Sequence, residues 1–312
     1  MTTRLILDCD TGSDDAIAIF AAVTHPDLDL VAVTTVNGNV ALEHTTENTL
    51  RALDHVGAGV PVYPGAARPF VRPDFPIPRD ILNEGSEFQQ ALLDLPAARS
   101  TVEKQNAVRF LIDTYLDDAN ADVTLVAVGP LTNVALALAT EPSLAQRIPR
   151  LVLMGGAAFV NGNVSVAAEF NVWVDPEAAE AVLSAGIREV VIVPLDATHS
   201  APLTSVDCDA FDALGTPAAT ASASLIRHRL THGQDGPEGS PVHDPMCVAY
   251  LARPDLFTES VEAYVSVETT GSRTLGQLLV DTRPWRTEGS NATVALRADH
   301  GVYRDFLHTA FE

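Results

Sequence analysis

The sequence predicts an α/β protein built on an open, mostly parallel, Rossmann-like sheet that is flanked by helices. Three observations lead to this fold class. Short apolar runs rich in β-branched residues alternate with longer runs rich in Ala and Leu, the alternation continues along most of the chain, and aromatic residues make up only 6% of it. A core with so few aromatic rings depends on Ala, Val, Leu and Ile, and repeated strand–helix units imply right-handed crossovers within a parallel sheet.

The apolar runs have the length of parallel strands that are covered on both faces. We expect strands over 4–7, 30–36, 60–63, 123–128, 150–154, 190–195 and 261–267, and helices over 14–24, 41–56, 106–116, 131–139, 176–184 and 218–228. Residues 68–99 and 231–245 break the alternation with Pro and Gly, and loops of this size often bind ligands. No internal repeat or low-complexity linker divides the chain, so residues 1–312 are predicted to form one domain.

The composition argues against two classes of partner. The chain carries 41 acidic and 19 basic residues, a net charge of −22, and Lys104 is its only lysine. This balance repels phosphate backbones and anionic membrane surfaces, so neither a nucleic acid nor a membrane is expected as a partner. Cys9, Cys208 and Cys247 are too irregularly spaced for a disulfide framework. With no signal-peptide pattern and no apolar run near the ~18 residues of a spanning helix, we expect a soluble cytoplasmic protein.

A cluster of acids follows the first predicted strand directly. Asp8, Asp10, Asp14 and Asp15 fall within eight residues, and Gly12 allows a sharp turn between them. Helix capping explains one or two of these acids but not four, and so many carboxylates are unfavourable together unless a cation neutralises them. Hard oxygen ligands select Ca²⁺ or Mg²⁺ over zinc. The cluster therefore predicts a metal site at the carboxyl end of a strand, where open parallel sheets bind ligands.

Further polar residues follow later strands and could converge on the same edge. Pro245 suits the first position of a helix, which makes Asp244 its expected N-cap, although the neighbouring His243 and the preceding loop also favour a functional role. Amide and carboxylate side chains after other strands offer donors and acceptors that suit vicinal hydroxyls. These are Asn37, Asn39, Asn161, Asn163, Glu169 and Asn171, and the tight turn at 129–133 would expose the carbonyl of Val128.

Taken together, these segments resemble the nucleoside hydrolases of the inosine–uridine-preferring type. The matching segments are Asp-Cys-Asp-Thr-Gly-Ser-Asp-Asp-Ala at 8–16, Val-Gly-Pro-Leu-Thr-Asn at 128–133, Met-Gly-Gly-Ala at 154–157, Ala-Glu-Phe-Asn at 168–171 and His-Asp-Pro at 243–245. The first is highly specific, and the others follow in the family's order and at its approximate spacing. The resemblance therefore covers nearly the whole chain.

The resemblance implies hydrolysis of the N-glycosidic bond of ribonucleosides to free base and ribose, in a homodimer or homotetramer. It implies one Ca²⁺ per subunit, held by Asp10, Asp15, Asp244 and the carbonyl of Val128. Asp10 would act as general base toward a water activated by the metal, and His243 would assist the leaving base. The implied substrate-binding residues are Asp14, Asn39, Met154, Asn163, Glu169 and Asn171.

The base half of the predicted pocket departs from the family's pattern. Family members often carry a His-Gly pair over the base, whereas residues 81–85 read Ile-Leu-Asn-Glu-Gly, and no histidine stands near Asn83. Members that act on inosine and uridine or on pyrimidine nucleosides tend to have tyrosines on the helix before His-Asp-Pro. This chain has Arg227, His228, Thr231 and His232 there. We expect Arg227 and His228 to contact the base. His228 or His232 could also assist the leaving group in place of His243, and the preferred base stays open.

Two other functions fit parts of the pattern. Asp8-Cys9-Asp10 after a strand also resembles the haloacid dehalogenase-type phosphatases, but Gly12 stands where that pattern has Thr or Val, and Lys104 lies in no suitable context for the lysine it needs. A ribose- or nucleoside-binding protein without hydrolytic activity would retain the sugar-binding residues. The retained Asp10 argues against it, whereas the altered base loop favours it.

Overall fold

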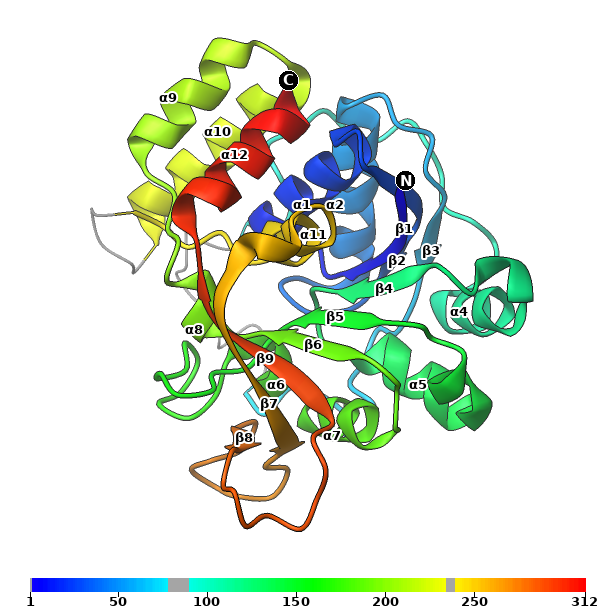
Figure 1. Ribbon diagram of the computed structural model, residues 1–312. Coiled ribbons are helices and arrows are strands. Elements are labelled where there is room, and N and C mark those ends of the chain that lie inside the picture. The colour runs from blue at the N-terminus through cyan, green and yellow to red at the C-terminus, as the bar shows by residue number, and fades with distance from the viewer. Residues whose placement is uncertain (1, 78–89, 234–238) are drawn as a thin grey trace.

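Residues 2–77, 90–233 and 239–312 are described by the computed structural model, and within them nine strands form one sheet (Figure 1). The strands are β1 (Thr3–Cys9), β2 (Leu28–Thr35), β3 (Val62–Pro64), β4 (Thr124–Ala127), β5 (Leu151–Met154), β6 (Val190–Val193), β7 (Phe257–Val267), β8 (Leu278–Asp281) and β9 (Ala292–Ala298). Their order is β3-β2-β1-β4-β5-β6-β9-β7-β8. Only β7 runs antiparallel to its neighbours β8 and β9 among these described strands, so the predicted mostly parallel α/β sheet is confirmed.

Helices cover both faces of the sheet. They are α1 (Ser13–Thr24), α2 (Leu42–His55), α4 (Ala107–Leu116), α5 (Thr132–Thr140), α6 (Phe170–Val174), α7 (Pro176–Ser184), α8 (Leu195–Thr198), α9 (Ser205–Leu214), α10 (Pro217–His232), α11 (Pro245–Ala252) and α12 (His300–Phe311), with 3-10 turns at Asp118–Asn120, Pro142–Gln146 and Pro254–Leu256. Several begin at a residue whose side chain accepts a backbone N–H, as Asp175 does for α7 and Thr216 for α10. In the described residues, no helix combines the length and apolar composition needed to cross a bilayer.

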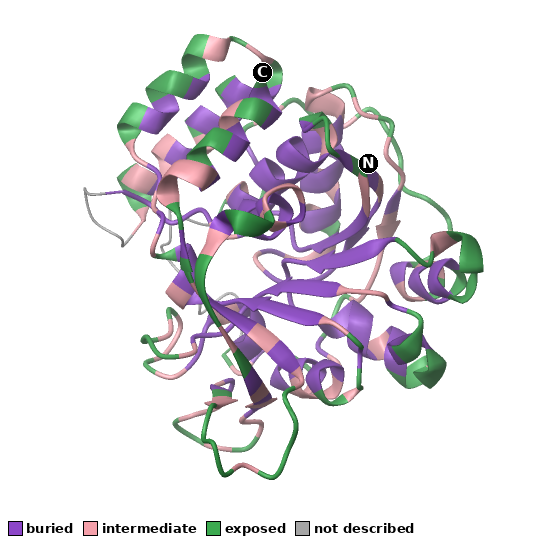
Figure 2. Cartoon of the chain, viewed as in Figure 1, coloured by how far each residue is buried: buried purple, intermediate pink, exposed green. Residues whose placement is uncertain are grey.

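The alternation of side chains along the strands divides the core into two layers. In β1, Leu5, Leu7 and Cys9 pack with α1, α2 and α9–α12, whereas Ile6 packs with α4, α5 and α7 on the other face. Figure 2 shows the resulting buried centre between the two helical layers. Because both faces of the central strands are covered, their sequences are continuously apolar rather than alternating, as parallel strands require.

The strand order reverses between β1 and β4, the point at which the chain switches from building one half of the sheet to building the other. Ligands of open α/β sheets bind beyond the carboxyl ends of strands at such a switch point. Asp10 and Val128 are the residues that directly follow β1 and β4, and the backbone N–H of Val128 still donates to the carbonyl of Asp8 at 2.8 Å. The topology therefore brings two predicted metal-site residues to one crevice.

The prediction was incomplete in the last third of the chain. It missed β8, β9, α9 and α12, and it shortened β7, which begins at Phe257 rather than at 261. β9 mixes polar with apolar residues and enters the sheet between β6 and β7, so only pairing with both neighbours defines it. α9 carries several aspartates and little apolar periodicity. The described parts of 68–99 contain no helix or strand, in agreement with the predicted loop, and the single-domain organisation stays a prediction.

Candidate active site

The carboxylate of Asp10 is held in one orientation at the carboxyl end of β1. The backbone N–H of Asn39 donates to its Oδ2 at 2.5 Å, and the side-chain amide of Asn39 donates to its backbone carbonyl at 3.4 Å. Glycine is required beside it, because a Cβ at Gly38 would overlap the carboxylate and a Cβ at Gly129 would lie 2.8 Å from Oδ1. The loops after β2 and β4 thus fix the position of Asp10.

Asp15 closes the turn between β1 and α1. Its carboxylate accepts the backbone N–H of Asp10 at 3.1 Å and that of Gly12 at 2.9 Å, and the Asn39 side chain donates to it at 3.3 Å. These bonds satisfy backbone amides of the buried turn that leads into α1, where negative charge is also favoured by the helix dipole. A single short segment therefore both begins α1 and supplies a fixed carboxylate to the crevice.

Three buried carboxylates meet at this point. Ligand oxygens of Asp14, Asp15 and Asp244 all lie within 4.8 Å of one another. Burial raises the pKa of Asp15 to about 7, with the charge of Asp14 as the next cause. Burial followed by neighbouring carboxylates also holds the pKa of Asp10 and Asp244 well above the ordinary value. Such mutual repulsion fits a donor set for a hard divalent cation.

Asp244 contributes to this group rather than capping a helix. It occupies the N-cap position of α11, as predicted, but its side chain makes no capping hydrogen bond. Asp10 is not part of this group of three, and its Oδ2 accepts the backbone N–H of Asn39. Asp8, the first acid of the motif, also lies apart, where its Oδ1 accepts Thr34 Oγ1 at 2.5 Å and Asn133 Nδ2 at 2.7 Å. Burial raises the pKa of Asp8 to about 6.

Arg229 on α10 was missed by the sequence prediction and is the only buried arginine or lysine in the part of the chain that the structure describes. Its guanidinium lies 3.2 Å from Asp14 Oδ1 and donates to Ser13 Oγ at 3.1 Å and to the carbonyl of Pro241 at 2.9 Å. It lowers the pKa of Asp14, against the opposing effect of burial. One cation therefore offsets one carboxylate and ties α10 to α1 and to the segment before α11.

The predicted sugar-binding residues after β5 form a second polar group. Glu169 caps α6, accepting the backbone N–H of Asn171 at 2.9 Å and that of Gly156 at 2.8 Å. The side-chain amide of Asn171 donates to the carbonyls of Val128 at 2.8 Å and Met154 at 3.2 Å. Burial raises the pKa of Glu169, and the charge of Asp14 adds to this shift. The structure thus brings this group against the acidic cluster.

Asn163 is more exposed than the rest of the predicted sugar-binding set. Its Oδ1 accepts the backbone N–H of Phe170 at 3.0 Å, next to Glu169. The neighbouring Gly162 lies directly against the backbone of Ala168, which a Cβ at Gly162 would overlap. Asn163 therefore lies at the outer edge of the group that contains Glu169 and Asn171.

His243 links the acidic cluster to the end of α8. Its backbone N–H donates to Asp14, and its ring Nδ1 lies 2.8 Å from Thr198 Oγ1. Burial, followed by the positive charge of Arg229, lowers the pKa of His243 to about 3. The ring is therefore neutral at physiological pH and can act on a ligand as a hydrogen-bond donor or acceptor.

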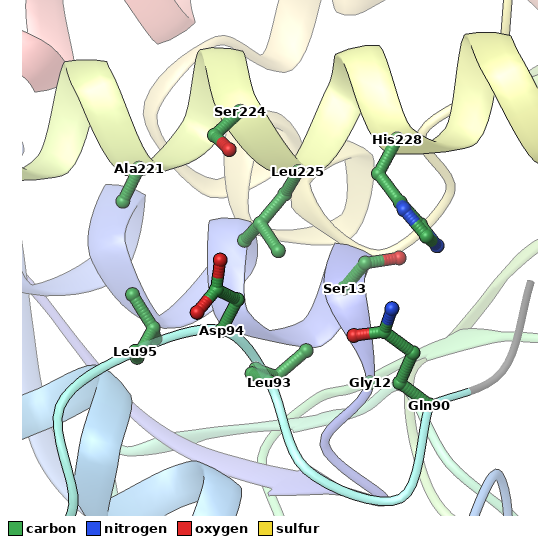
Figure 3. Close-up of a pocket in the computed structure, with 10 residues that line it drawn as sticks. All are labelled: Gly12, Ser13, Gln90, Leu93, Asp94, Leu95, Ala221, Ser224, Leu225 and His228. Atoms are coloured by element: carbon green, nitrogen blue, oxygen red, sulfur yellow. The ribbon is translucent and has the colours of Figure 1, made fainter.

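The two α10 residues predicted to contact the base lie in different surroundings. His228 lines a cavity of about 140 Å³ together with Ser13 and Gln90, between α10, the start of α1 and the 90–95 segment (Figure 3). Arg227 instead forms ion pairs of 2.7 and 2.6 Å with Asp209 and Asp212 on α9. The structure does not bring Arg227 to the site, because one helical step rotates its side chain toward α9. The predicted base loop at 81–85 lies outside the described residues.

Comparison with known proteins agrees with this geometry. The family described as inosine-uridine preferring nucleoside hydrolase matches residues 5–305. The pyrimidine-specific ribonucleoside hydrolase RihA of Escherichia coli (strain K12) is 41% identical over 314 residues, which cover 98% of this chain and 97% of that protein. A purine-preferring ribonucleoside hydrolase from Gardnerella vaginalis superposes with a TM-score of 0.88 at 29% identity, over 99% of this chain and 98% of that one.

A plant nucleoside hydrolase, the PpNRh1 enzyme, superposes with a TM-score of 0.85 at 26% identity, over 100% of this chain and 99% of that one. The phosphatase alternative has no support among these proteins. That class of phosphatase also needs a lysine in its active site, and Lys104, the only lysine of the sequence, is exposed in the loop before α4.

The buried ion pair of Arg229 can be tested by stability. Arg229→Met is expected to lower the free energy of unfolding by about 3 kcal/mol, because Asp14 stays buried without its cationic partner. Urea unfolding in the presence of a metal chelator measures this loss, and the double variant Asp14→Asn/Arg229→Met should recover part of it. Arg227→Met is the matched control. It should lower the free energy of unfolding by less than about 1 kcal/mol, since the ion pairs of Arg227 are exposed. Equal losses from both single variants would contradict a special role for the buried pair.

Proposed function

This chain belongs to the inosine-uridine preferring nucleoside hydrolase family and is a hydrolase of the N-glycosidic bond of nucleosides; from that premise we propose that its acidic cluster holds one calcium ion and that Asp10 is the general base. The observation that carries the proposal is the group of buried carboxylates of Asp14, Asp15 and Asp244. Buried like charges at this density are unfavourable unless a cation neutralises them.

Of this group, Asp15 and Asp244 would hold the ion, together with Asp10 and the carbonyl of Val128. Asp14, which is paired with Arg229, would bind the sugar instead. Oxygen donors alone make up this set, which suits calcium better than zinc. When bound, the ion supplies positive charge that orients vicinal ribose hydroxyls and lowers the pKa of a nearby water. The carbonyl of Val128 already accepts the Asn171 amide, and its second lone pair stays available for a cation.

Asp10 is suited to accept the proton of the attacking water. Its Oδ2 is held by the backbone N–H of Asn39, and the backbones of Gly38 and Gly129 lie so close to the carboxylate that a Cβ at either position would collide with it. A fixed carboxylate at the carboxyl end of β1 can take up the proton without first reorganising.

Cleavage of the N-glycosidic bond builds positive charge on the ribosyl ring. Glu169 and Asp14 bring fixed negative charge to the crevice, because backbone amides hold Glu169, and Arg229 and the His243 amide hold Asp14. Preoriented charges of this kind stabilise a cationic transition state more effectively than mobile solvent. Asn39, Asn163 and Asn171 would supply hydrogen bonds to the sugar hydroxyls.

His243 is the residue that we assign to the leaving base. Its ring Nε2 has no hydrogen-bond partner among the described residues, whereas Nδ1 is engaged by Thr198. A neutral ring can stabilise the departing base by donating a hydrogen bond.

Pyrimidine ribonucleosides are the substrates that we propose as preferred. The E. coli relative named as pyrimidine-specific is 41% identical along almost its whole length, whereas the Gardnerella enzyme named as purine-preferring is 29% identical. Assembly into a homodimer or homotetramer and a cytoplasmic location stay predictions.

Asp10→Asn is expected to keep the fold and to lower kcat on uridine by about 10²-fold or more, because the general base is lost. Release of reducing sugar measures turnover, and circular dichroism checks the fold. A calcium chelator should abolish wild-type turnover, and added calcium should restore it. The exposed Asp29→Asn serves as the control and should be unaffected. Wild-type turnover that survives the chelator, or near-normal kcat for Asp10→Asn, would contradict the proposed roles of calcium and Asp10.

His243→Ala should lower kcat/KM on nucleosides by about 10²-fold but that on p-nitrophenyl riboside by less than about fivefold, since an activated leaving group needs little assistance. Steady-state kinetics on both substrates measure the difference. His308→Ala on α12 is the control. Equal losses on both substrates would remove His243 from leaving-group assistance.

A kinetic comparison of uridine, cytidine, inosine and adenosine tests the base preference. We expect kcat/KM for uridine or cytidine to exceed that for inosine by about tenfold or more, the discrimination that a shaped pocket provides. A higher value for either purine nucleoside would overturn the pyrimidine assignment without affecting the hydrolase reaction itself.

A further inference from the structure

Thr198 is a fully buried residue whose hydroxyl faces His243. It ends α8, the short helix that directly follows the carboxyl end of β6, and its Oγ1 lies 2.8 Å from Nδ1 of His243. No other hydrogen-bond partner of this hydroxyl exists among the residues that the structure describes. The contact joins segments that are 45 residues apart in the sequence.

Hydrogen-bond accounting determines the direction of this contact. A threonine hydroxyl both donates and accepts, whereas a neutral imidazole has one protonated and one unprotonated nitrogen. If Nδ1 carried the ring proton and donated to Thr198, the buried hydroxyl proton would have no acceptor among the described side chains and carbonyls. If Thr198 donates to Nδ1, the hydroxyl proton is satisfied and the ring proton resides on Nε2. Buried donors are nearly always satisfied, so the second arrangement is favoured.

The backbone around Thr198 holds the hydroxyl in place. Its N–H donates to the carbonyl of Pro194 at 3.2 Å within the α8 turn. Asp196 of the same turn accepts the backbone N–H groups of Ala158 and Phe159 at 2.8 and 2.9 Å, which anchors α8 to the loop after β5. The orientation of the His243 ring therefore depends on α8, which these hydrogen bonds hold in place at the carboxyl edge of the sheet.

We propose that Thr198 is a positioning residue for the nucleoside hydrolase reaction: its hydroxyl donates to Nδ1 of His243 and keeps the ring proton on Nε2, directed to the leaving base. The proposal rests on the role proposed above for His243. As the N-glycosidic bond breaks, the base takes the bonding electron pair and becomes electron-rich. An Nε2–H group stabilises it by hydrogen bonding, whereas the other tautomer would present a lone pair to it.

Two substitutions at this position separate the hydroxyl from the side-chain volume. Thr198→Val removes the hydroxyl but keeps the shape, and it should lower kcat/KM on uridine by about tenfold, the effect of one lost hydrogen bond. The same variant should change kcat/KM on p-nitrophenyl riboside by less than about twofold. Thr198→Ser keeps the hydroxyl and should retain most of the activity on both substrates. Equal losses on both substrates for Thr198→Val would overturn the proposal.

A matched control and a double variant exclude a general packing effect. Thr132 is also buried, and its hydroxyl donates to Asp175 at 2.6 Å, so Thr132→Val removes a buried hydroxyl elsewhere. It should leave the ratio of the two substrates unchanged. In a His243→Ala background, Thr198→Val should cause no further loss on uridine, because the two residues act as one unit. A further tenfold loss in that background would overturn the proposal.

A measurement of the tautomer does not depend on turnover. In ¹⁵N-histidine-labelled protein, the His243 signals, identified by their absence from His243→Gln, should show an unprotonated Nδ1 and a protonated Nε2. Thr198→Val should raise the population of the other tautomer, and Thr198→Ser should not. A protonated Nδ1 in the wild type would overturn the proposal even if nucleosides are hydrolysed. If His243→Ala has no effect on turnover, the role of His243 fails, while this measurement still decides how Thr198 acts on the ring.

Discussion

Repulsion between buried carboxylates governs the organisation of the crevice at the switch point of the sheet. Asp10, Asp15 and Asp244 all have a raised pKa because each is buried among the others. The fold offsets part of this cost with Arg229 and with backbone amides from Gly12 and Asn39. Among the described residues the cluster has one ion pair, between Arg229 and Asp14, so the charges of Asp10, Asp15 and Asp244 are left for a bound cation to neutralise.

The same constraint explains why the surrounding loops are rich in glycine and amides. Gly38 and Gly129 allow the backbone to approach Asp10, where any Cβ would collide with its carboxylate. Behind them, Asn133 donates to Asp8 and to the carbonyl of Thr35, which joins β1 to β2 beneath the cluster. The four acids of the sequence motif thus have two roles. Asp10, Asp14 and Asp15 face the crevice, whereas Asp8 lies in the core behind them and accepts a hydrogen bond from Asn133.

Much of the fold and half of the site could be predicted from the sequence. The continuous apolar strands identified the parallel sheet, and the order of the polar motifs after those strands identified the residues that the structure gathers around Asp10. The base side could not be predicted, because Arg227, His228 and Arg229 are consecutive and their roles depend on the rotation of α10. Packing turns Arg227 to α9, His228 to a cavity and Arg229 to Asp14. Thr198 carried no sequence signal, since it lies 45 residues from His243.

The acidic motif between β1 and α1 was determined by the sequence alone, because its spacing places carboxylates around a single turn and local hydrogen bonds fix them there. Its partners were decided by the tertiary structure. Asp244, Arg229 and Glu169 come from distant segments, and only the reversal of strand order between β1 and β4 brings their elements to one edge. Local geometry thus specifies carboxylates that suit a hard cation, whereas long-range packing specifies the charges and hydrogen bonds that let those carboxylates serve a nucleoside.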